Sequence, residues 1–201
     1  MSQHSPETKE DKAWVEIVAP VDMRVLRALC GDLECLYRIN PYLDFKTWRN
    51  TGPDSFHIEC HNNSNDQELV LDLTRVRNSD TAFSVNYAQG LKAATHFELS
   101  TVPQGSKLVI TDDYNRLPQS EREQRINEVD KSLEVWGRDI YAYLMRYKRW
   151  GWFAPWCWYM RRVWTPMMPM TRRVVWMVIL VDAAFFGLFL FVMLIYWIEF
   201  G

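Results

Sequence analysis

The sequence has few of the features that mark secreted, disulfide-stabilised or nucleic-acid-binding proteins. Its only cysteines, Cys30, Cys35, Cys60 and Cys157, form no CxxC pair, so we expect free thiols. The polar N-terminus has no apolar run and indicates no secretory signal. The formal net charge of −2 argues against a nucleic-acid partner, because phosphate binding needs a basic surface. We expect no cofactor.

Long apolar runs are absent until residues 174–198, which read VVWMVILVDAAFFGLFLFVMLIYWI. At about 1.5 Å per residue, these roughly 25 residues can cross a hydrocarbon core of ~30 Å. The alternative is a buried core helix of a soluble domain, but such helices are rarely this long and this uniformly apolar. The sequence therefore predicts a soluble domain held to a membrane by one C-terminal transmembrane helix.

Acidic residues are absent between Asp139 and Asp182, where basic residues and tryptophans gather. Eight of the ten tryptophans lie from Trp136 onward. This combination, just before a spanning helix, suits the anionic cytoplasmic leaflet and its interface. The positive-inside rule then predicts that the N-terminal domain lies in the cytoplasm. The basic residues of this region are Arg146, Lys148, Arg149, Arg161, Arg162, Arg172 and Arg173.

The chain before the apolar run changes periodicity several times. Residues 1–12 are polar and aperiodic, which predicts a disordered tail. A short strand at residues 14–18 precedes two short helices between residues 21 and 40, with Asp22 as N-cap and a break at Gly31. From residue 43 to 115, apolar and polar residues alternate through six segments separated by turns. This pattern predicts an antiparallel meander with one apolar face.

A long amphipathic helix follows the meander. Ser120 and Glu123 form a capping box, after which apolar residues recur at steps of three and four. Because a one-sided sheet must cover its apolar face, we expect this helix to pack there, with the short helix pair closing one end. The apolar stripe consists of Ile126, Val129, Leu133, Trp136, Ile140, Leu144 and Tyr147.

This order of elements resembles the START-like superfamily, also called SRPBCC or helix-grip, in its polyketide cyclase/dehydrase and lipid-transport branch. Residues 33–42, LECLYRINPY, look like that branch's segment between the second helix and the second strand. The resemblance implies an α+β fold over residues 13–149, with a curved antiparallel sheet wrapped on a long C-terminal helix. It also implies an apolar pocket for a lipid, quinone, sterol or polyketide-like molecule. The C-terminal anchor departs from the common soluble form.

The apolar strand faces and the helix stripe are the candidate walls of that pocket. The same residues would form either a cavity or a filled core, and both remain open. Asp112 is the candidate polar group because it shares a face with Leu108 and Ile110; the alternative is a solvated carboxylate at the end of a strand. An inward carboxylate could bind a ligand's polar head or act as a general base. The other candidates are Phe45, Phe56, Ile58, Cys60, Leu71, Leu73, Phe83, Val85, Phe97, Leu99, Val129, Leu133, Trp136 and Ile140.

Residues 150–173 form a segment rich in Trp and Arg between the domain and the span. Pro155 could start a short helix whose apolar residues, Trp156 and Met160 among them, would lie in the membrane interface. The alternative is a Trp-rich linker packed on the domain. Pro166 would then interrupt the helix before the span. The basic residues assigned to the membrane or to a partner are Arg161, Arg162, Arg172 and Arg173.

Two clusters superficially suggest metal binding. His57 and His61 lie four residues apart on a strand, which separates them by about 13 Å at ~3.3 Å per residue, and Cys60 points to the opposite face. Methionines near Cys157 could hold Cu(I), but methionine at an interface is more often apolar packing. We therefore expect no metal site.

Asp182 is the single charge within the apolar run. A carboxylate at this depth costs on the order of 2.5–3.5 kcal/mol on insertion scales, so we expect a compensating partner helix. Ala183, Ala184 and Gly187 provide a small-residue surface on which helices can approach closely. The alternative is a neutral aspartic acid bonded to its own backbone.

Three functions remain in view. The first is a membrane-anchored START-like protein that binds an apolar ligand at the cytoplasmic face. The second is an accessory subunit of a larger membrane complex, or a homo-oligomer, docked through its transmembrane helix. The third, an enzyme of the cyclase or dehydratase type, has only Asp112, Tyr87 and Tyr114 as candidate acid–base groups, and we rank it last.

Overall fold

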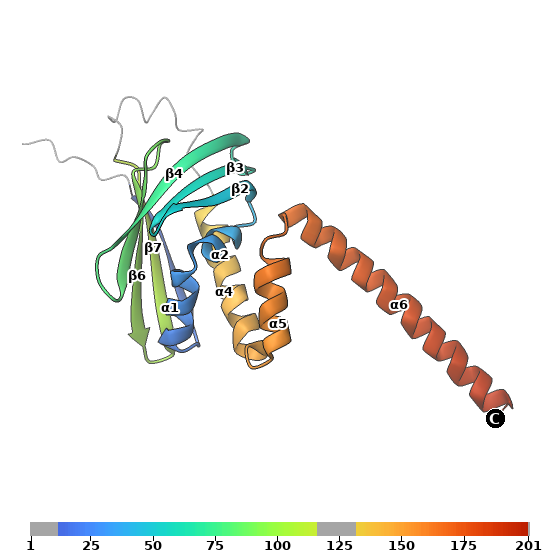
Figure 1. Ribbon diagram of the computed structural model, residues 1–201. Helices are drawn as coiled ribbons and strands as arrows, with labels where there is room; N and C mark the ends of the chain where they lie inside the picture. Colours follow the sequence, from blue (N-terminus) through green and yellow to red (C-terminus); the bar gives the residue numbers. More distant parts are fainter. Residues whose placement is uncertain (1–11, 116–131, 201) are drawn as a thin grey trace, which may run out of the picture. The chain divides into compact units, whose positions relative to one another are not determined.

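A computed structural model of the chain describes residues 12–115 and 132–200 (Figure 1). The chain divides into two compact units, one ending at Pro166 and the other beginning at Met167. The first unit contains a curved sheet with its helices, and the second contains one long helix. The predicted capping box of Ser120 and Glu123, and the stripe residues Ile126 and Val129, lie outside the described residues.

The sheet has seven antiparallel strands in the order β1-β7-β6-β5-β4-β3-β2. Consecutive strands from β2 to β7 pair as neighbours, and β1 closes the other edge by pairing with β7. This is the predicted meander, with the N-terminal strand added at the β7 edge. The strands are β1 (Lys12–Ala19), β2 (Leu43–Gly52), β3 (Ser55–Asn62), β4 (Gln67–Arg77), β5 (Ala82–Tyr87), β6 (Ala94–Val102) and β7 (Gly105–Asp113).

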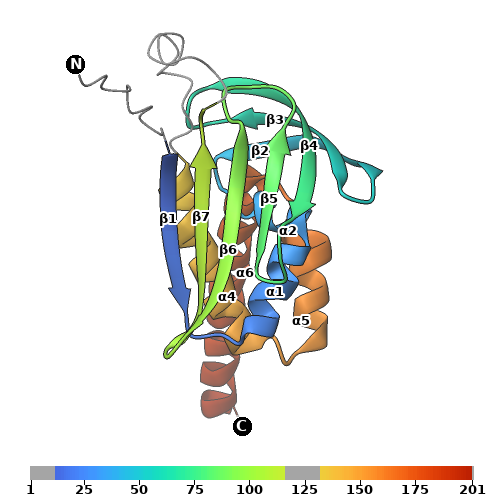
Figure 2. The ribbon, with the colours of Figure 1, turned by 90° about the vertical axis from the view of Figure 1, so that its left-hand side faces the viewer.

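Helices α1 (Met23–Gly31), α2 (Leu33–Arg38) and α4 (Leu133–Trp150) lie on one side of the sheet (Figure 2). The predicted N-cap is confirmed, because the Asp22 carboxylate accepts a hydrogen bond from the Arg24 backbone amide at 2.6 Å. The predicted break between the two short helices is also confirmed. The architecture is therefore the α+β helix-grip arrangement expected from the sequence.

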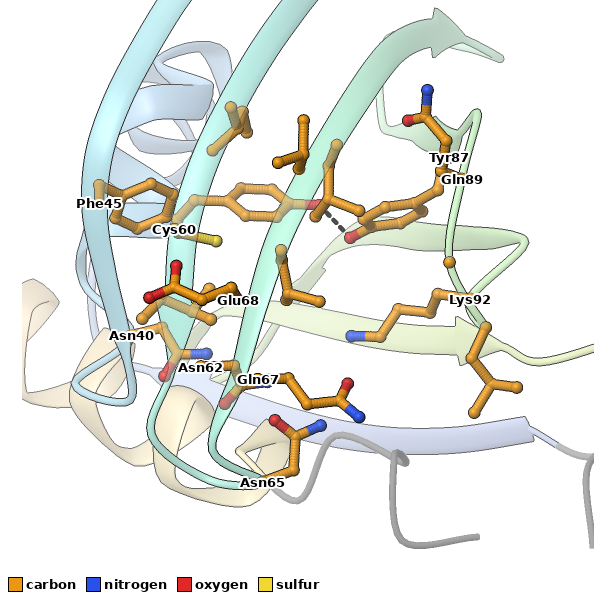
Figure 3. A pocket seen from close by; sticks show the side chains of 18 of the residues that line it. Asn40, Phe45, Cys60, Asn62, Asn65, Gln67, Glu68, Tyr87, Gln89 and Lys92 are labelled. Carbon is orange, nitrogen blue, oxygen red and sulfur yellow. Dashed lines mark hydrogen bonds between the residues drawn. The ribbon is translucent and has the colours of Figure 1, made fainter. Parts of the chain in front are cut away.

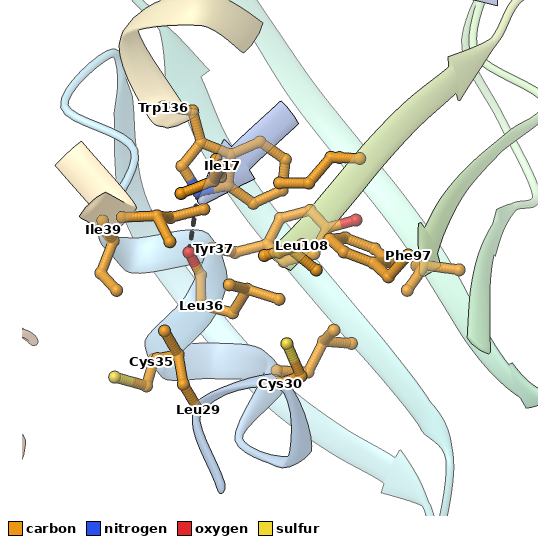
Figure 4. Close-up of a cluster of buried hydrophobic side chains, with 14 of the residues drawn as sticks. Ile17, Leu29, Cys30, Cys35, Leu36, Tyr37, Ile39, Phe97, Leu108 and Trp136 are labelled. Atoms are coloured by element: carbon orange, nitrogen blue, oxygen red, sulfur yellow. Dashed lines mark hydrogen bonds between the residues drawn. The ribbon is translucent and has the colours of Figure 1, made fainter. Parts of the chain in front are cut away.

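Buried apolar side chains of the sheet and of these helices form a hydrophobic core (Figure 4). Phe97 and Leu108 from the sheet are fully buried, as are Leu36 of α2 and Ile140 of α4. The Trp136 indole Nε1 donates to the Leu36 backbone carbonyl at 2.9 Å, which satisfies the buried polar atom of this large side chain. This bond ties α4 to α2 across the core.

Gly137 lets α4 approach the sheet closely at β1. A Cβ at this position would lie 2.7 Å from Val15 Cγ2 and 3.3 Å from Val15 Cγ1. Only glycine avoids this overlap without a shift of the helix or the strand. The helix is thus held against the β1 edge, while the opposite end of the curved sheet, at β2 to β4, is farther from it.

The segment after α4 packs on the domain through its apolar face. Helix α5 (Ala154–Tyr159) continues into a π-helical turn, η2 (Met160–Trp164). We predicted that Trp156 and Met160 would lie in a membrane interface. In the first unit Met160 is 7% exposed, and the Trp156 ring centroid lies 6.4 Å from that of Tyr147. Helix α5 lies beside α4, so these two side chains face the domain, and the placement of the segment in a membrane interface stays a prediction.

The second unit is helix α6 (Pro169–Phe200). Residues 170–199 are long and apolar enough to cross a membrane, and none of the most apolar part is buried. Within residues 12–115 and 132–200, the apolar run predicted as one C-terminal helix is therefore the one candidate membrane span, and its helix starts several residues earlier than the sequence pattern indicated.

Candidate functional site

A cavity of about 590 Å³ lies between the curved sheet and the ends of helices α2 and α4 (Figure 3). Its walls come from the starts of β2 and β4, the end of β3, the loop between β5 and β6, the end of α2 and one residue of α4. Asp66, Glu68 and Gln89 are exposed at its rim. This volume is in the range of pockets that hold small organic ligands.

Some predicted pocket residues line this cavity and others do not. Phe45, Ile58, Cys60, Leu71 and Trp136 line it. A second group is buried in the hydrophobic core instead: Phe56, Leu73, Phe83, Val85, Phe97, Leu99, Leu133 and Ile140. Val129 lies outside the described residues. Both alternatives left open by the sequence thus occur in one sheet, with a filled core at one end and a cavity at the other.

Asp112 is buried and paired, not solvated at a strand end. Its side chain is 1% exposed, and the Lys92 ammonium lies 2.8 Å from Oδ2. The buried Thr95 hydroxyl donates to Oδ1 at 2.6 Å. The pairing of β6 with β7 sets Thr95 opposite Asp112 and so produces this contact. The inward orientation that we expected for Asp112 is present, and Lys92 stands between this carboxylate and the cavity.

Hydrogen bonds continue from Asp112 to the cavity wall. Tyr87 Oη lies 3.0 Å from Thr95 Oγ1, and Tyr37 Oη lies 2.7 Å from Tyr87 Oη. Both tyrosines and Lys92 line the cavity. Figure 3 shows Tyr87 and Lys92 reaching into the same space from the strand and loop beyond β4. The Lys92 ammonium also lies 5.9 Å from the Tyr87 ring centroid and 6.0 Å from that of Tyr114.

Burial controls the protonation of these tyrosines. It raises the pKa of Tyr37 well above its ordinary value, and the neighbouring Tyr87 adds to this increase. Burial likewise raises the pKa of Tyr87. Both phenols therefore keep their protons at neutral pH and act as hydrogen-bonding groups in the cavity wall.

The sequence pattern missed most of the polar residues of this wall. Lys92 follows Gly90, whose φ of 93° is a conformation that glycine adopts without strain. The resulting turn directs Lys92 to Asp112, although the two residues are twenty positions apart. Tyr37 was visible only as one apolar position of a short helix. A lysine in the turn before β6 and an inward carboxylate on β7 could have indicated this ion pair. Recognising the pair from the sequence requires knowing that β6 and β7 are neighbouring strands.

Exposed aromatic side chains gather near the end of the first unit. Trp152 is 79% exposed and Trp158 is 63% exposed, and Trp150 and Phe153 are each more than 40% exposed. Arg149 lies over the Trp150 ring at 5.5 Å. The Arg161 guanidinium contacts the domain, where it donates a hydrogen bond to Asp32 Oδ2 at 2.7 Å. We call Trp150, Trp152, Phe153 and Trp158 the aromatic surface.

Comparison with known proteins identifies solved structures of similar fold. No protein-family model and no curated protein matches the chain. A protein from Arthrobacter aurescens matches at TM-score 0.51 and 11% identity, over 71% of this chain and 90% of its own. TTHA0849 from Thermus thermophilus matches at TM-score 0.50 and 12% identity, over 68% of this chain and 97% of its own. A START superfamily protein from Mycobacterium smegmatis matches at TM-score 0.49 and 13% identity, over 67% of this chain and 96% of its own.

Proposed function

The chain has the START-like helix-grip fold with a candidate membrane span after it, and we propose that it binds an apolar ligand, such as a lipid or quinone, at the cytoplasmic face of a membrane. The observation that carries this proposal is the cavity of about 590 Å³ between the sheet and Trp136. The apolar side chains that line a cavity of that size lack packing partners on one side, which costs stability. A ligand would restore those contacts.

Membrane attachment rests on helix α6 and the residues before it. A spanning helix needs about 20 apolar residues, and α6 exceeds that length. Arg172 and Arg173 immediately precede its apolar part, which supports a cytoplasmic position for the N-terminal domain. Tryptophans favour the membrane–water interface, so the aromatic surface is the part of the first unit that we assign to the membrane.

The test recovers what the protein carries from its host membrane. The full-length chain is purified in a mild detergent, and apolar extracts are quantified by mass spectrometry against protein. We expect about one apolar molecule per chain. Leu71→Trp would place an indole in the cavity and should remove that molecule. Val76→Trp is the matched control, because Val76 is an exposed residue of the same strand that does not line the cavity.

The outcomes separate a bound ligand from adherent lipid. Loss of the molecule in Leu71→Trp and its retention in Val76→Trp support binding in the cavity. Equal amounts in both variants would mean that the lipid adheres elsewhere, and a ligand-free wild-type chain would contradict the proposal.

A second function is favoured by the composition of α6. Asp182 interrupts its apolar surface, and a Cβ added to Gly187 would meet no atom within 4 Å. A small-residue surface beside a membrane carboxylate suits contact with another helix. We therefore also propose a role as an accessory subunit of a membrane complex. Asp182→Leu should abolish co-purification of its partners in mild detergent, with Ile195→Leu as control; unchanged co-purification would refute this role.

A further inference from the structure

The outward side of α5 and η2 combines tryptophan with arginine. Trp156 and Met160, four residues apart, face the domain. Trp158 lies two residues from each of them, so it points to the opposite side of the helix, where it is exposed. Arg162 follows Trp158 by four residues and is also exposed, and both side chains line one open groove with Arg161. The outward side therefore presents an indole and guanidinium groups together.

This end of the first unit carries positive charge that no carboxylate compensates. Within residues 12–115 and 132–200, four exposed cations beside the aromatic surface form no ion pair. Arg161 differs from them, because it pairs with Asp32 at 2.7 Å. We call these four cations and the aromatic surface together the basic–aromatic surface. The four cations are Arg146, Lys148, Arg149 and Arg162.

The neighbouring helices do not cancel this charge. Asp32 and Glu34 of α2 line the groove, but each is paired with an arginine, at 2.7 Å and 2.8 Å. Helix α1 lines a small cavity together with α5, so its charges also belong to this end of the unit. Arg24 and Arg27 are exposed on α1, against one exposed acidic residue, its N-cap Asp22. The balance of charge stays positive.

From this combination we propose that the basic–aromatic surface binds the head-group layer of an anionic membrane, as a second attachment besides α6. The inference rests on the membrane attachment in the proposed function and names the lipid class. Tryptophan side chains favour the level of the head groups. Each lysine or arginine near an anionic leaflet strengthens binding by about fivefold. Lipid phosphates thus match both components of the surface.

Chain length also favours a membrane over an acidic protein as the partner. The first unit ends at Pro166, and the candidate span begins at Met170. Four residues reach no more than about 14 Å at ~3.6 Å per residue. A bilayer that contains the span is therefore within reach of this end of the first unit. An acidic protein would match the charge, but it would leave the placement before the span without a role.

The cavity and the basic–aromatic surface lie at opposite ends of α4. Trp136 lines the cavity, and Trp150 ends the helix. The fourteen residues from one to the other rise by about 21 Å at ~1.5 Å per residue. Substitutions on the basic–aromatic surface therefore leave the cavity wall unchanged, and docking can be measured apart from ligand binding.

The experiment uses the native tryptophans of the full-length chain as reporters. The chain is reconstituted into nanodiscs of phosphatidylcholine, with or without phosphatidylglycerol, and oxidised by hydroxyl radicals. Peptide mass spectrometry gives the oxidation of Trp152 and Trp158 relative to Trp14, which is exposed on β1. We expect this ratio to fall by about threefold or more in the anionic nanodiscs. It should recover in about 1 M salt, which screens exposed charges beyond ~3 Å.

A double variant tests the role of the cations. Arg149→Ala combined with Arg162→Ala should weaken docking by about 25-fold, so that the anionic lipid no longer protects either tryptophan. The matched control combines Arg49→Ala with Arg77→Ala. These two arginines are exposed on β2 and β4 and do not belong to the basic–aromatic surface. The control should keep the protection of the wild-type chain.

The outcomes separate this inference from the proposed function. Equal oxidation in the two kinds of nanodisc overturns it, whether the tryptophans are protected or exposed, because lipid charge then has no effect. Protection that persists in high salt or in the first double variant also overturns it. A chain that carries a cavity ligand but shows no lipid-dependent protection refutes this inference alone. A ligand-free chain that is still protected refutes the cavity proposal alone, and a chain that does not enter nanodiscs refutes both.

Discussion

Replacing Lys92 with methionine would leave the Asp112 carboxylate buried without its cation. The Lys92 side chain is 16% exposed and that of Asp112 is 1% exposed, so solvent screens the pair weakly. At 2.8 Å, the Coulomb attraction is about 6 kcal/mol at an effective dielectric of ~20, before the cost of desolvation. Removing one partner of a buried pair typically costs about 3–5 kcal/mol. Because Lys92 is partly exposed, we expect the lower end, about 3 kcal/mol.

A second substitution isolates the charge from the shape of the site. Asp112→Asn keeps an acceptor for Thr95 and removes the negative charge. Combined with Lys92→Met, it should recover about 2 kcal/mol of the lost stability, because no isolated charge then remains buried. The assay is urea unfolding of the full-length chain in mild detergent, followed by near-ultraviolet circular dichroism of the buried tryptophan.

The reasoning about this pair is refuted by either of two results. One is a Lys92→Met variant within about 0.5 kcal/mol of wild type, which would mean that the pair contributes little. The other is a double variant no more stable than Lys92→Met alone, which would mean that the loss comes from lysine packing and not from an unpaired carboxylate.

Two further predictions concern packing. Gly137→Ala should destabilise the domain by about 1–3 kcal/mol despite alanine's higher helix propensity, because the new methyl group would lie 2.7 Å from Val15 Cγ2. Urea unfolding measures this change, and a variant of equal or greater stability would contradict the prediction. Iodoacetamide at pH 8 should label Cys157 and spare Cys30 and Cys35, because burial raises the pKa of Cys30 to about 12 and that of Cys35 to about 11. Labelling of Cys30 or Cys35 before denaturation would contradict this prediction.

The sheet and the short helices could be predicted because their signals are local. Phe56, Ile58 and Cys60 alternate with polar residues, and β3 buries those three side chains as the alternation requires. Asp22 precedes a helical repeat and caps α1 as expected. A residue pattern of period two or 3.6 is set by backbone geometry alone, so it survives without knowledge of the tertiary structure.

The cavity could not be predicted because the same pattern describes a filled core. Phe45 and Phe97 are both inward apolar residues of strands, yet Phe45 lines the cavity and Phe97 is fully buried in the core. The difference depends on where α4 approaches the sheet and on the bulges in β2, such as that between Phe45 and Thr47. Curvature of this kind arises from the whole sheet.

The polar wall and the aromatic segment depended on contacts between distant residues. Lys92 reaches Asp112 only after β6 pairs with β7 and Gly90 turns the chain. The pattern of residues 154–164 predicted an amphipathic helix, but such a pattern is compatible with packing on α4 as well as with a membrane interface. The Met160 side chain is buried in the domain, whereas the side chains of Trp152 and Trp158 are exposed. The hydrophobic effect favours burial of an apolar helix face, but it is non-directional and does not specify the surface against which that face packs.

Photo-crosslinking tests the central claim, that an apolar ligand occupies this cavity, most directly. A tetradecanol with a diazirine on its chain would be irradiated with the full-length protein in micelles, and the modified residues would be mapped by peptide mass spectrometry. The account predicts labels on cavity residues such as Phe45 and Leu71, and loss of these labels when unlabelled tetradecanol is added in excess. Labels confined to α6 and the aromatic surface, or labels that excess tetradecanol does not displace, would contradict it.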